Sequence, residues 1–198
     1  MIRALFFDVG SVLIHFDLKD SIGLYEKHNS IPAGKLYEAF HDHQYWKDFT
    51  LGLISQEDFL NKVSENFNGE LDIQEFIQFF YRNYTANTEL FEYLRSISGK
   101  YILGIISNNP KELFDYFYDT YGWSEIFKVR AVSSYIHIRK PDKRIFEYAI
   151  QQTGVKPEES IYFDDRIDRI DGARDLGMHL HIFEDNNKLK DFISNLGK

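Results

Sequence analysis

Cysteine is missing from the 198-residue sequence, and proline is scarce, with four residues in all. The first absence excludes disulfide bonds, thiolate metal sites and cysteine nucleophiles. Long apolar runs are missing too, because the first one, residues 4–7, already ends at Asp8. Such a run is too short for a membrane span or for the apolar region of a signal peptide, so we expect a cytoplasmic protein without a membrane partner.

An excess of positive charge is also absent, since the formal net charge is −8. This charge argues against a nucleic-acid partner but allows a local positive pocket for a small anion. Hydrophobic residues make up 43% of the chain and charged residues 27%, close to the average of globular domains. The length allows one compact domain with room for a small insertion.

Continuous apolar runs predict strands that are covered by helices on both faces. Five such runs are present, at residues 3–8, 101–106, 128–132, 160–163 and 178–183. Helical patterns lie between them; residues 142–153, for example, place apolar side chains on one face and are followed by Gly154, a frequent helix stop. This alternation predicts an α/β fold with a doubly wound, Rossmann-like parallel sheet.

Residues 17–85 break the alternation, because they show amphipathic helices, such as residues 56–67 and 73–84, and no clear strand. A helical block inserted after the first strand predicts a lid over the carboxyl edge of the sheet, where ligands bind in open α/β folds. We therefore expect a core of residues 1–16 and 86–198, and a four-helix cap of residues 17–85.

Polar residues that suit phosphate chemistry stand at the predicted strand ends. Asp8 could attack as a nucleophile, although an aspartate there often only forms a turn or caps a helix. Ser107 and Asn108 precede a helix that opens at Pro110, so they could bind a phosphate oxygen. Alternatively, Ser107 or Asn109 simply caps that helix. Lys140 could neutralise phosphate charge and restrain the nucleophile, or lie in a solvated basic turn.

Two adjacent acids, Asp164 and Asp165, end a further buried strand. Adjacent carboxylates repel each other unless a cation lies close by. Hard oxygen ligands of this kind, completed by a substrate phosphate, suit Mg²⁺. The next two acids, Asp168 and Asp171, are better explained as a solvated helix start that the helix dipole favours.

Taken in order, these motifs resemble those of the haloacid-dehalogenase-like (HAD) superfamily over nearly the whole chain. The matching residues are Asp8-x-Gly10, Ser107-Asn108, Lys140-Pro141 and Asp164-Asp165. The helical insert resembles the C1 cap of that family. The resemblance implies a Mg²⁺-dependent phosphatase that acts on a small phosphorylated metabolite through an aspartyl-phosphate intermediate.

The same resemblance implies a role for each residue. Asp8 attacks phosphorus, while Ser107, Asn108 and Lys140 bind the phosphoryl group. Asp8, Asp165 and the backbone carbonyl of Gly10 supply oxygen ligands to Mg²⁺, and Asp164 supports this shell or exchanges roles with Asp165.

Gly10 departs from the pattern, because phosphatases of the family usually carry a second aspartate there as general acid and base. Loss of a general acid costs on the order of 10²–10⁴ in rate. Dehalogenases lack this aspartate too, so the alternatives are a 2-haloacid dehalogenase or a catalytically silent phosphate-binding protein. Similar cap-bearing phosphatases with glycine include sugar-1-phosphate phosphatases, which makes a sugar phosphate a candidate substrate.

Other side chains carry weaker hypotheses. Arg169 stands where relatives commonly show asparagine, and its charge would either tighten phosphate binding or compete with Mg²⁺. His179 and His181 share one side of the last predicted strand, as a metal pair or, more commonly, as packed strand residues. Candidates for the missing proton donor are His15, His41, His43 and Lys47, for which a surface or core position is the commoner alternative.

Overall fold

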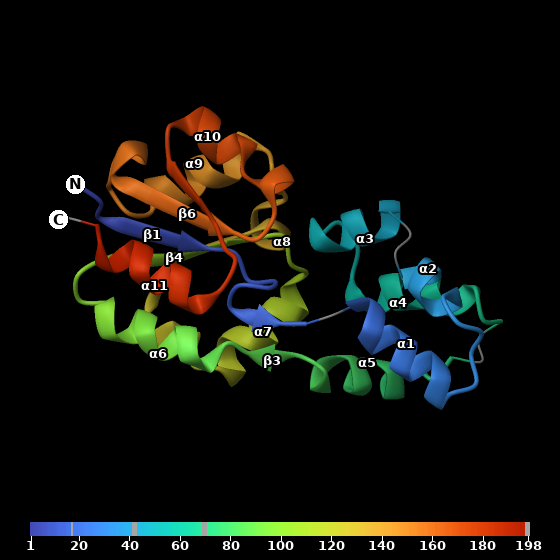
Figure 1. Ribbon diagram of the computed structural model, residues 1–198. Coiled ribbons are helices and arrows are strands. Elements are labelled where there is room, and N and C mark those ends of the chain that lie inside the picture. The colour runs from blue at the N-terminus through green and yellow to red at the C-terminus, as the bar shows by residue number, and fades with distance from the viewer. Residues whose placement is uncertain (17, 41–42, 69–70, 197–198) are drawn as a thin grey trace.

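The computed structural model describes residues 1–16, 18–40, 43–68 and 71–196. Its centre is a five-stranded parallel sheet in the order β5-β4-β1-β6-β7 (Figure 1). The strands are β1 Ala4–Phe7, β4 Ile102–Ser107, β5 Phe127–Val132, β6 Ser160–Asp164 and β7 His179–Ile182. All five predicted strands are therefore confirmed, and so is the doubly wound α/β fold.

Helices cover both faces of the sheet, and β1 contributes side chains to each. Leu5 and Phe7 join one buried cluster, whereas Ala4 and Phe6 join the other, as the alternation of side chains along a strand requires. On the first face lie α6 Thr88–Ile97, α7 Lys111–Thr120 and α11 Asn186–Ser194; on the second lie α9 Lys143–Gln151 and α10 Asp171–Leu176.

Short elements complete the core. The helix α8, Ser133–Ile136, follows β5 directly, and three 3₁₀ turns span Trp123–Glu125, Pro157–Glu159 and Ile167–Arg169. The predicted helix at residues 142–153 is confirmed as α9: Asp142 caps it by accepting the N–H of Arg144, and it ends before Gly154, whose φ is +67°. Pro110 is the N-cap of α7 and not its first helical residue.

Between β1 and β4 the chain forms helices that lie beyond the carboxyl edge of the sheet (Figure 1). They are α1 Leu18–His28, α2 Lys35–Phe40, α3 His43–Thr50, α4 Gln56–Glu65 and α5 Ile73–Arg82. These are five helices among the described residues, so the expectation of four was wrong. The six residues of α2 are too few to show a helical period in the sequence.

A two-stranded antiparallel ribbon joins these helices to the core. It pairs β2, Ile14–His15, with β3, Thr85–Ala86. The segment expected to be purely helical thus ends in a strand, and two residues are too short to leave an alternating pattern. Among the described residues, no helix is long and apolar enough to cross a membrane.

The turn after α3 is docked on α8. Ser133 donates its hydroxyl to the carbonyl of Thr50, and Nδ1 of His137 lies 2.7 Å from the carbonyl oxygen of Leu51. Gly52 has φ +68°, and a Cβ there would lie 2.5 Å from the carbonyl oxygen of Ser134. Only glycine suits this close approach, which holds α3 beside the carboxyl edge of the sheet.

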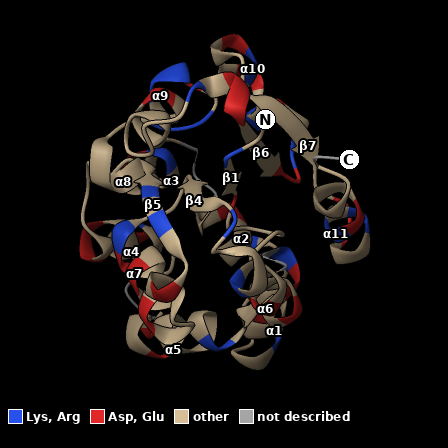
Figure 2. Ribbon diagram, turned by 90° about the vertical axis from the view of Figure 1, so that its left-hand side faces the viewer, with Lys and Arg blue, Asp and Glu red and all other residues tan. Residues whose placement is uncertain are grey.

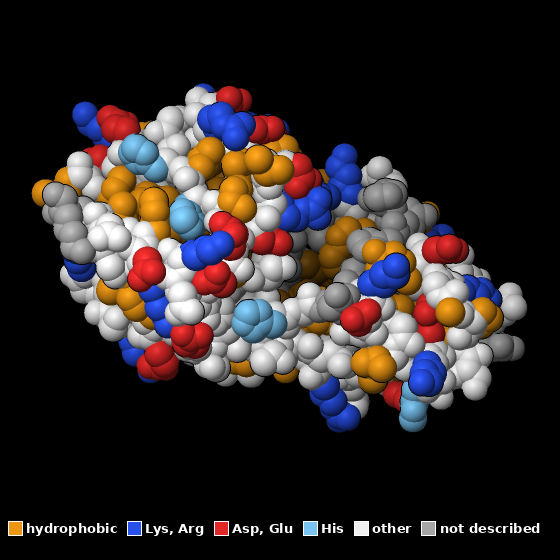
Figure 3. All heavy atoms as spheres, in the orientation of Figure 1, with side chains coloured by type: hydrophobic (Ala, Val, Ile, Leu, Met, Phe, Trp, Pro, Cys, Tyr) orange, Lys and Arg blue, Asp and Glu red, His pale blue; other side chains and the backbone are white. Residues whose placement is uncertain are grey.

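Acidic and basic segments are interspersed over the view in Figure 2, so the negative net charge is not confined to one region there. The space-filling view shows a hollow between the sheet core and the helices α1–α5, with Lys and Arg side chains on its rim (Figure 3). The carboxyl ends of β1, β4 and β6 lie toward this side.

Candidate active site

Asp8 directly follows β1, and its N–H donates to the carbonyl of Phe163 at 2.9 Å, which keeps it in the sheet. Three donors converge on Oδ1: the N–H of Val9 at 2.7 Å, the hydroxyl of Ser107 at 3.1 Å, and Nζ of Lys140 at 2.8 Å. No described residue forms a hydrogen bond with Oδ2. One oxygen is therefore fixed and the other is left to face a bound group.

Lys140 is 2% exposed, and its ammonium group lies between two carboxylates. Nζ is 2.8 Å from Oδ1 of Asp8, 2.8 Å from Oδ2 of Asp164 and 2.7 Å from the hydroxyl of Tyr162. A buried ammonium is tolerated when it is paired in this way. The solvated basic turn considered from the sequence is therefore not what the structure shows.

The backbone of Lys140 is held as firmly as its side chain. Asn108 donates Nδ2–H to the carbonyl of Lys140 at 3.0 Å and accepts the N–H of Lys140 at 2.8 Å. Its side chain is thus used to fix the lysine. Ser107 accepts a hydrogen bond from Nδ2 of Asn109 at 2.8 Å, so neither Ser107 nor Asn109 caps α7.

Asp164 is fully buried, and both of its oxygens already have partners. Oδ2 accepts from Lys140 and from the hydroxyl of Tyr162, and Oδ1 accepts the N–H of Arg166 at 2.9 Å. Asp165 is half-buried, and its carboxylate accepts a hydrogen bond from the hydroxyl of Ser11. The second acid is therefore the freer of the pair.

A metal ion fits this group of acids. Asp8, Asp164 and Asp165 each offer an oxygen, and these atoms lie within 4.8 Å of one another. Only hard oxygen donors are present in the group, which suits Mg²⁺. Three carboxylates face one ammonium, that of Lys140, so two negative charges are left for a divalent cation to balance.

Electrostatics give the same picture. Burial raises the pKa of Asp8 to about 6; Lys140 opposes this rise and the charge of Asp164 adds to it. Burial and the charge of Asp164 also raise the pKa of Asp165. Both carboxylates are thus held in an environment that disfavours their ionised form, and a bound cation would relieve the repulsion.

The acids that follow Asp165 do not belong to the group. Asp168 is exposed and lies 2.8 Å from Arg166, and Asp171 pairs with Arg174. These pairs agree with a solvated helix start. Arg169 lies 3.8 Å from Asp168, and its charge is not among the main influences on the pKa of Asp165.

The two described candidates for the missing proton donor, His15 and Lys47, make no contact that marks them as one. His15 is exposed on β2 opposite Thr85, and Lys47 is exposed on α3. His41 and the side chain of His43 lie outside the described residues. These four remain hypotheses.

The two histidines of β7 have separate surroundings. Nε2 of His179 lies 3.1 Å from the carbonyl oxygen of Glu158. The ring of His181 packs against Phe163 and Phe192, with centroids 5.3 and 4.3 Å away. The ring of His181 is therefore packed as the packed-strand alternative expects, whereas His179 is exposed.

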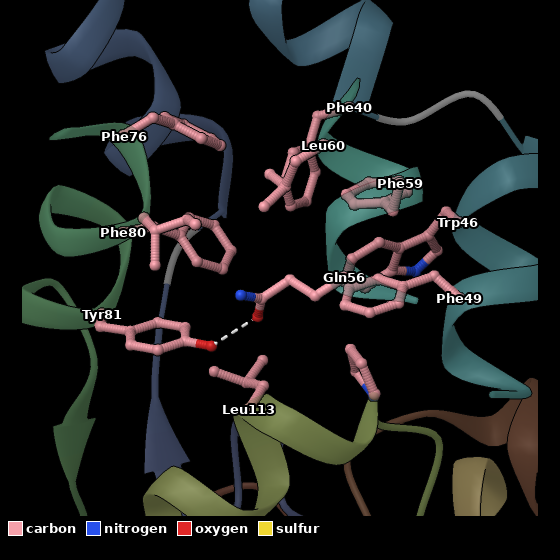
Figure 4. A pocket seen from close by; sticks show the side chains of 12 residues that line it. Phe40, Trp46, Phe49, Gln56, Phe59, Leu60, Phe76, Phe80, Tyr81 and Leu113 are labelled. Atoms are coloured by element: carbon pink, nitrogen blue, oxygen red, sulfur yellow. Dashed lines mark hydrogen bonds between the residues drawn. The ribbon is translucent and has the colours of Figure 1, made fainter. Parts of the chain in front are cut away.

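An aromatic cavity lies among helices α2–α5 and the start of α7, where Phe80 faces Phe59 and Trp46 across an apolar space (Figure 4). Tyr81 donates its hydroxyl to Oε1 of Gln56 at 2.8 Å. A second cavity, of about 160 Å³, shares Trp46, Phe80 and Leu113 with the first and extends to Gly10 and Ser11. Apolar space therefore runs from the loop after Asp8 in between the helices α2–α5.

Sequence reasoning missed Tyr162 and Ser11. Tyr162 lies two residues before Asp164 on β6, and this spacing on a strand puts both side chains on one face, which was a usable signal. Ser11 adopts a positive φ of 59°, which aims its side chain in a way that the sequence does not reveal.

Comparisons with known proteins support the resemblance. A family model described as haloacid dehalogenase-like hydrolase matches residues 2–177. Pyrimidine 5'-nucleotidase YjjG of Escherichia coli is 26% identical over 79% of this chain and 73% of its own length. Drimenol cyclase drtB of Aspergillus calidoustus is 22% identical over 99% of this chain, which spans only 37% of the cyclase, and the chain spans 17% of mouse acyl-CoA dehydrogenase family member 10.

Two solved structures share the whole fold. A HAD family enzyme from Bacteroides thetaiotaomicron, in complex with magnesium and inorganic phosphate, has a TM-score of 0.82 at 21% identity and covers 96% of this chain and 99% of its own. A predicted HAD-like family hydrolase from Porphyromonas gingivalis has a TM-score of 0.82 at 25% identity, over 100% and 99% of the two chains.

The raised pKa of Asp8 predicts that Asp8→Asn stabilises the metal-free protein at about pH 7.5. Folding raises this pKa from 3.8 to about 6, so the ionised carboxylate opposes folding by on the order of 3 kcal/mol. The gain should shrink as the pH falls through 6, because folded wild type then takes up a proton. Denaturant unfolding with chelator present measures it.

The control is Asp168→Asn, since the Asp168 carboxylate is exposed and paired with Arg166. This variant should be no more stable than wild type, either near pH 7.5 or below pH 6. An Asp8→Asn protein that is less stable than wild type near pH 7.5 would show instead that the pairing of Asp8 with Lys140 outweighs its burial.

Proposed function

We propose that this chain, which belongs to the haloacid dehalogenase-like hydrolase family, is a Mg²⁺-dependent phosphatase that hydrolyses a small phosphate ester through an aspartyl-phosphate at Asp8. One observation carries the proposal: the group of three carboxylates around the buried Lys140, with one oxygen of Asp8 fixed and the other free of protein hydrogen bonds.

The first step follows from the contacts of Asp8. The donors on Oδ1 orient the carboxylate, so that Oδ2 attacks phosphorus and the leaving group departs on the opposite side. Lys140 neutralises the charge that develops, and the hydroxyl of Ser107 turns from Oδ1 of Asp8 to hold a phosphoryl oxygen. Water then cleaves the aspartyl-phosphate and regenerates Asp8.

The start of α7 adds donors to the same site. Its N-cap, Pro110, makes no side-chain cap hydrogen bond. The N–H groups of the first turn therefore suit an anion, and the positive end of the helix dipole favours one there.

The metal site of the proposal consists of Asp8, Asp165 and the backbone carbonyl of Gly10. Mg²⁺, when bound there, would neutralise phosphoryl charge and orient the ester for attack. Asp164 contributes by holding Lys140, since both of its oxygens are bonded to protein groups. The freer Asp165 is the better ligand of the pair.

For the substrate, the proposal takes a small phosphorylated metabolite, in line with the phosphatase and nucleotidase names among the relatives. The cavity beside Gly10 and Ser11 has mostly apolar walls, including Phe16, Trp46 and Phe80. Such walls favour a carbon skeleton with few hydroxyl groups, so a sugar phosphate is the weaker candidate.

The proposal divides the chain into a catalytic core, residues 1–16 and 86–198, and a helical cap, residues 17–85, that covers the site. It places the enzyme in the cytoplasm, consistent with a sequence without cysteine. The net charge of −8 disfavours a nucleic-acid partner.

The dehalogenase alternative rests on Gly10, because that reaction needs no aspartate at this position. The group of three carboxylates argues against it. Such a group is suited to a metal ion, and dehalogenation needs no metal. Release of halide from a 2-haloacid without metal, and no release of phosphate from esters, would establish this alternative. Absence of both activities would favour a silent phosphate-binding protein.

The metal site predicts that chelation abolishes phosphatase activity and that Mg²⁺ restores it. Asp165→Asn should lower kcat/KM by more than the roughly 10–100-fold typical of an outer-shell residue, because it removes a ligand. Asp168→Asn is the matched control and should stay near wild type. If Asp168→Asn proves the more damaging variant, the metal shell has been misplaced.

Gly10 predicts a steep dependence of kcat/KM on the leaving group. A weakly basic leaving group departs without a proton, whereas an alkoxide needs one, so aryl, acyl and anomeric phosphates should be preferred to alkyl phosphates by about 10²–10⁴-fold. A Cβ at Gly10 would meet no atom within 4 Å, so Gly10→Asp fits and should narrow the gap by accelerating alkyl esters.

A leaving-group series measured in both proteins tests this point. A flat dependence on leaving-group pKa in wild type would mean that another residue already donates the proton. His15 and Lys47 would then be the first positions to replace.

A further inference from the structure

A positively charged cleft lies between α3 and the loop that carries Lys140. Its volume is about 550 Å³. The charged residues that line it are Lys47, Arg139, Lys140, Arg144, Arg169 and the single carboxylate of Asp142. In a chain of net charge −8, five cations against one acid is a local reversal of sign.

Two of these cations are already neutralised. Lys140 pairs with Asp8 and Asp164, and Arg144 lies 2.6 Å from Asp142. The positive charges of Lys140 and Arg144 are therefore already balanced by carboxylates of the protein.

The remaining cations, Arg139, Arg169 and Lys47, lack comparable partners. Arg139 is half-buried, and its guanidinium group forms no hydrogen bond or ion pair with any described residue. Arg169 lies 3.8 Å from Asp168, whose carboxylate is already bound at 2.8 Å by Arg166. Lys47 is exposed on the wall formed by α3.

The two guanidinium groups disfavour each other. Burial and the neighbouring charge of Arg169 lower the pKa of Arg139. A partly desolvated arginine beside a second one is unfavourable until an anion joins them. A guanidinium fork matches a carboxylate or phosphate with two parallel hydrogen bonds, so the pair is suited to an oxyanion.

We propose that Arg139, Arg169 and Lys47 form a second anion subsite, which binds a carboxylate or phosphate group of the substrate other than the phosphoryl group that is hydrolysed. The proposal rests on the proposed phosphatase function and narrows its substrate class to phosphate esters that carry a second acidic group. Arg139 and Arg169 come from the core and Lys47 from α3, so the same group would join the two sides of the cleft.

The position of the subsite favours a small substrate as the source of the anion. Arg139 directly precedes Lys140, whose Nζ contacts Asp8, so the two anion sites share one short loop. A molecule with two acidic groups a few bonds apart can therefore reach both. A polyanion would meet the negative surface of the rest of the chain.

The test uses two pairs of phosphate esters, each differing only in a carboxylate or its neutral amide: 2-phosphoglycolate with 2-phosphoglycolamide, and 4-carboxyphenyl phosphate with 4-carbamoylphenyl phosphate. Wild type should favour the carboxylate member of at least one pair in kcat/KM. Arg139→Gln and Arg169→Gln should each lower kcat/KM for that member by about 10–100-fold, mainly through KM, since a charged hydrogen bond is lost. The amide should change by less than about 3-fold.

The matched control is Arg144→Gln, which lines the same cleft but is paired with Asp142. It should leave the preference for the carboxylate intact. Equal losses for carboxylate and amide in Arg139→Gln, or no preference in wild type, would overturn the subsite. Turnover of the amide in wild type reports the phosphatase function itself, so the two ideas fail separately.

A last experiment, with acetate as the probe, tests whether the subsite binds an acidic group of the substrate or a separate anion that acts as an effector. Acetate should inhibit the carboxylate ester competitively and this inhibition should weaken in Arg139→Gln. Activation of the amide ester by acetate, without competition against the carboxylate ester, would show that the cleft takes a separate anion, and the proposal would be wrong.

Discussion

The ammonium group of Lys140 between Asp8 and Asp164 is the interaction on which the site depends. It joins the ends of β1 and β6 to the loop before α9. Removing the ammonium would leave the buried Asp164 without its cation, a change that typically costs about 3–5 kcal/mol. The surroundings serve to hold it. Asn108 bonds both backbone groups of Lys140, and a Cβ at Gly172 would lie only 2.2 Å from the carbonyl oxygen of Pro141, so α10 packs directly on this loop.

The remaining charges divide into two regions of opposite sign. Around Asp8 the carboxylates exceed the cations, which suits a divalent cation, and burial together with the charge of Asp164 raises the pKa of Asp8 and of Asp165. Beside it, in the cleft under α3, Arg139 and Arg169 exceed the acids. A phosphate ester with a second acidic group would place its phosphoryl group beside Asp8 and its second anionic group beside Arg139 and Arg169. The metal ion would then balance the negative charge of the first region, and the second anionic group the positive charge of the cleft.

The sequence predicted the sheet and the strand-end residues well, because continuous apolar runs and the polar residues after them are local signals. Asp8, Lys140 and Asp164 were expected to meet, and they do. The use of the Asn108 side chain to hold Lys140 and the contribution of Tyr162 could not be predicted, because packing decides which donor reaches which oxygen across the sheet. The short helix α2 and the β2–β3 ribbon contain too few residues to show a period.

The central claim, that Asp8 becomes phosphorylated, is tested most directly by acid-quenching wild-type protein during turnover of an aryl phosphate with Mg²⁺ and mapping the modified peptide by mass spectrometry. The account predicts an acid-stable, hydroxylamine-sensitive phosphate on the peptide that contains Asp8. It predicts none in Asp8→Asn, which should fold and yet release no product. Release of phosphate by Asp8→Asn at the wild-type rate, or phosphorylation of a residue other than Asp8 in wild type, would contradict it.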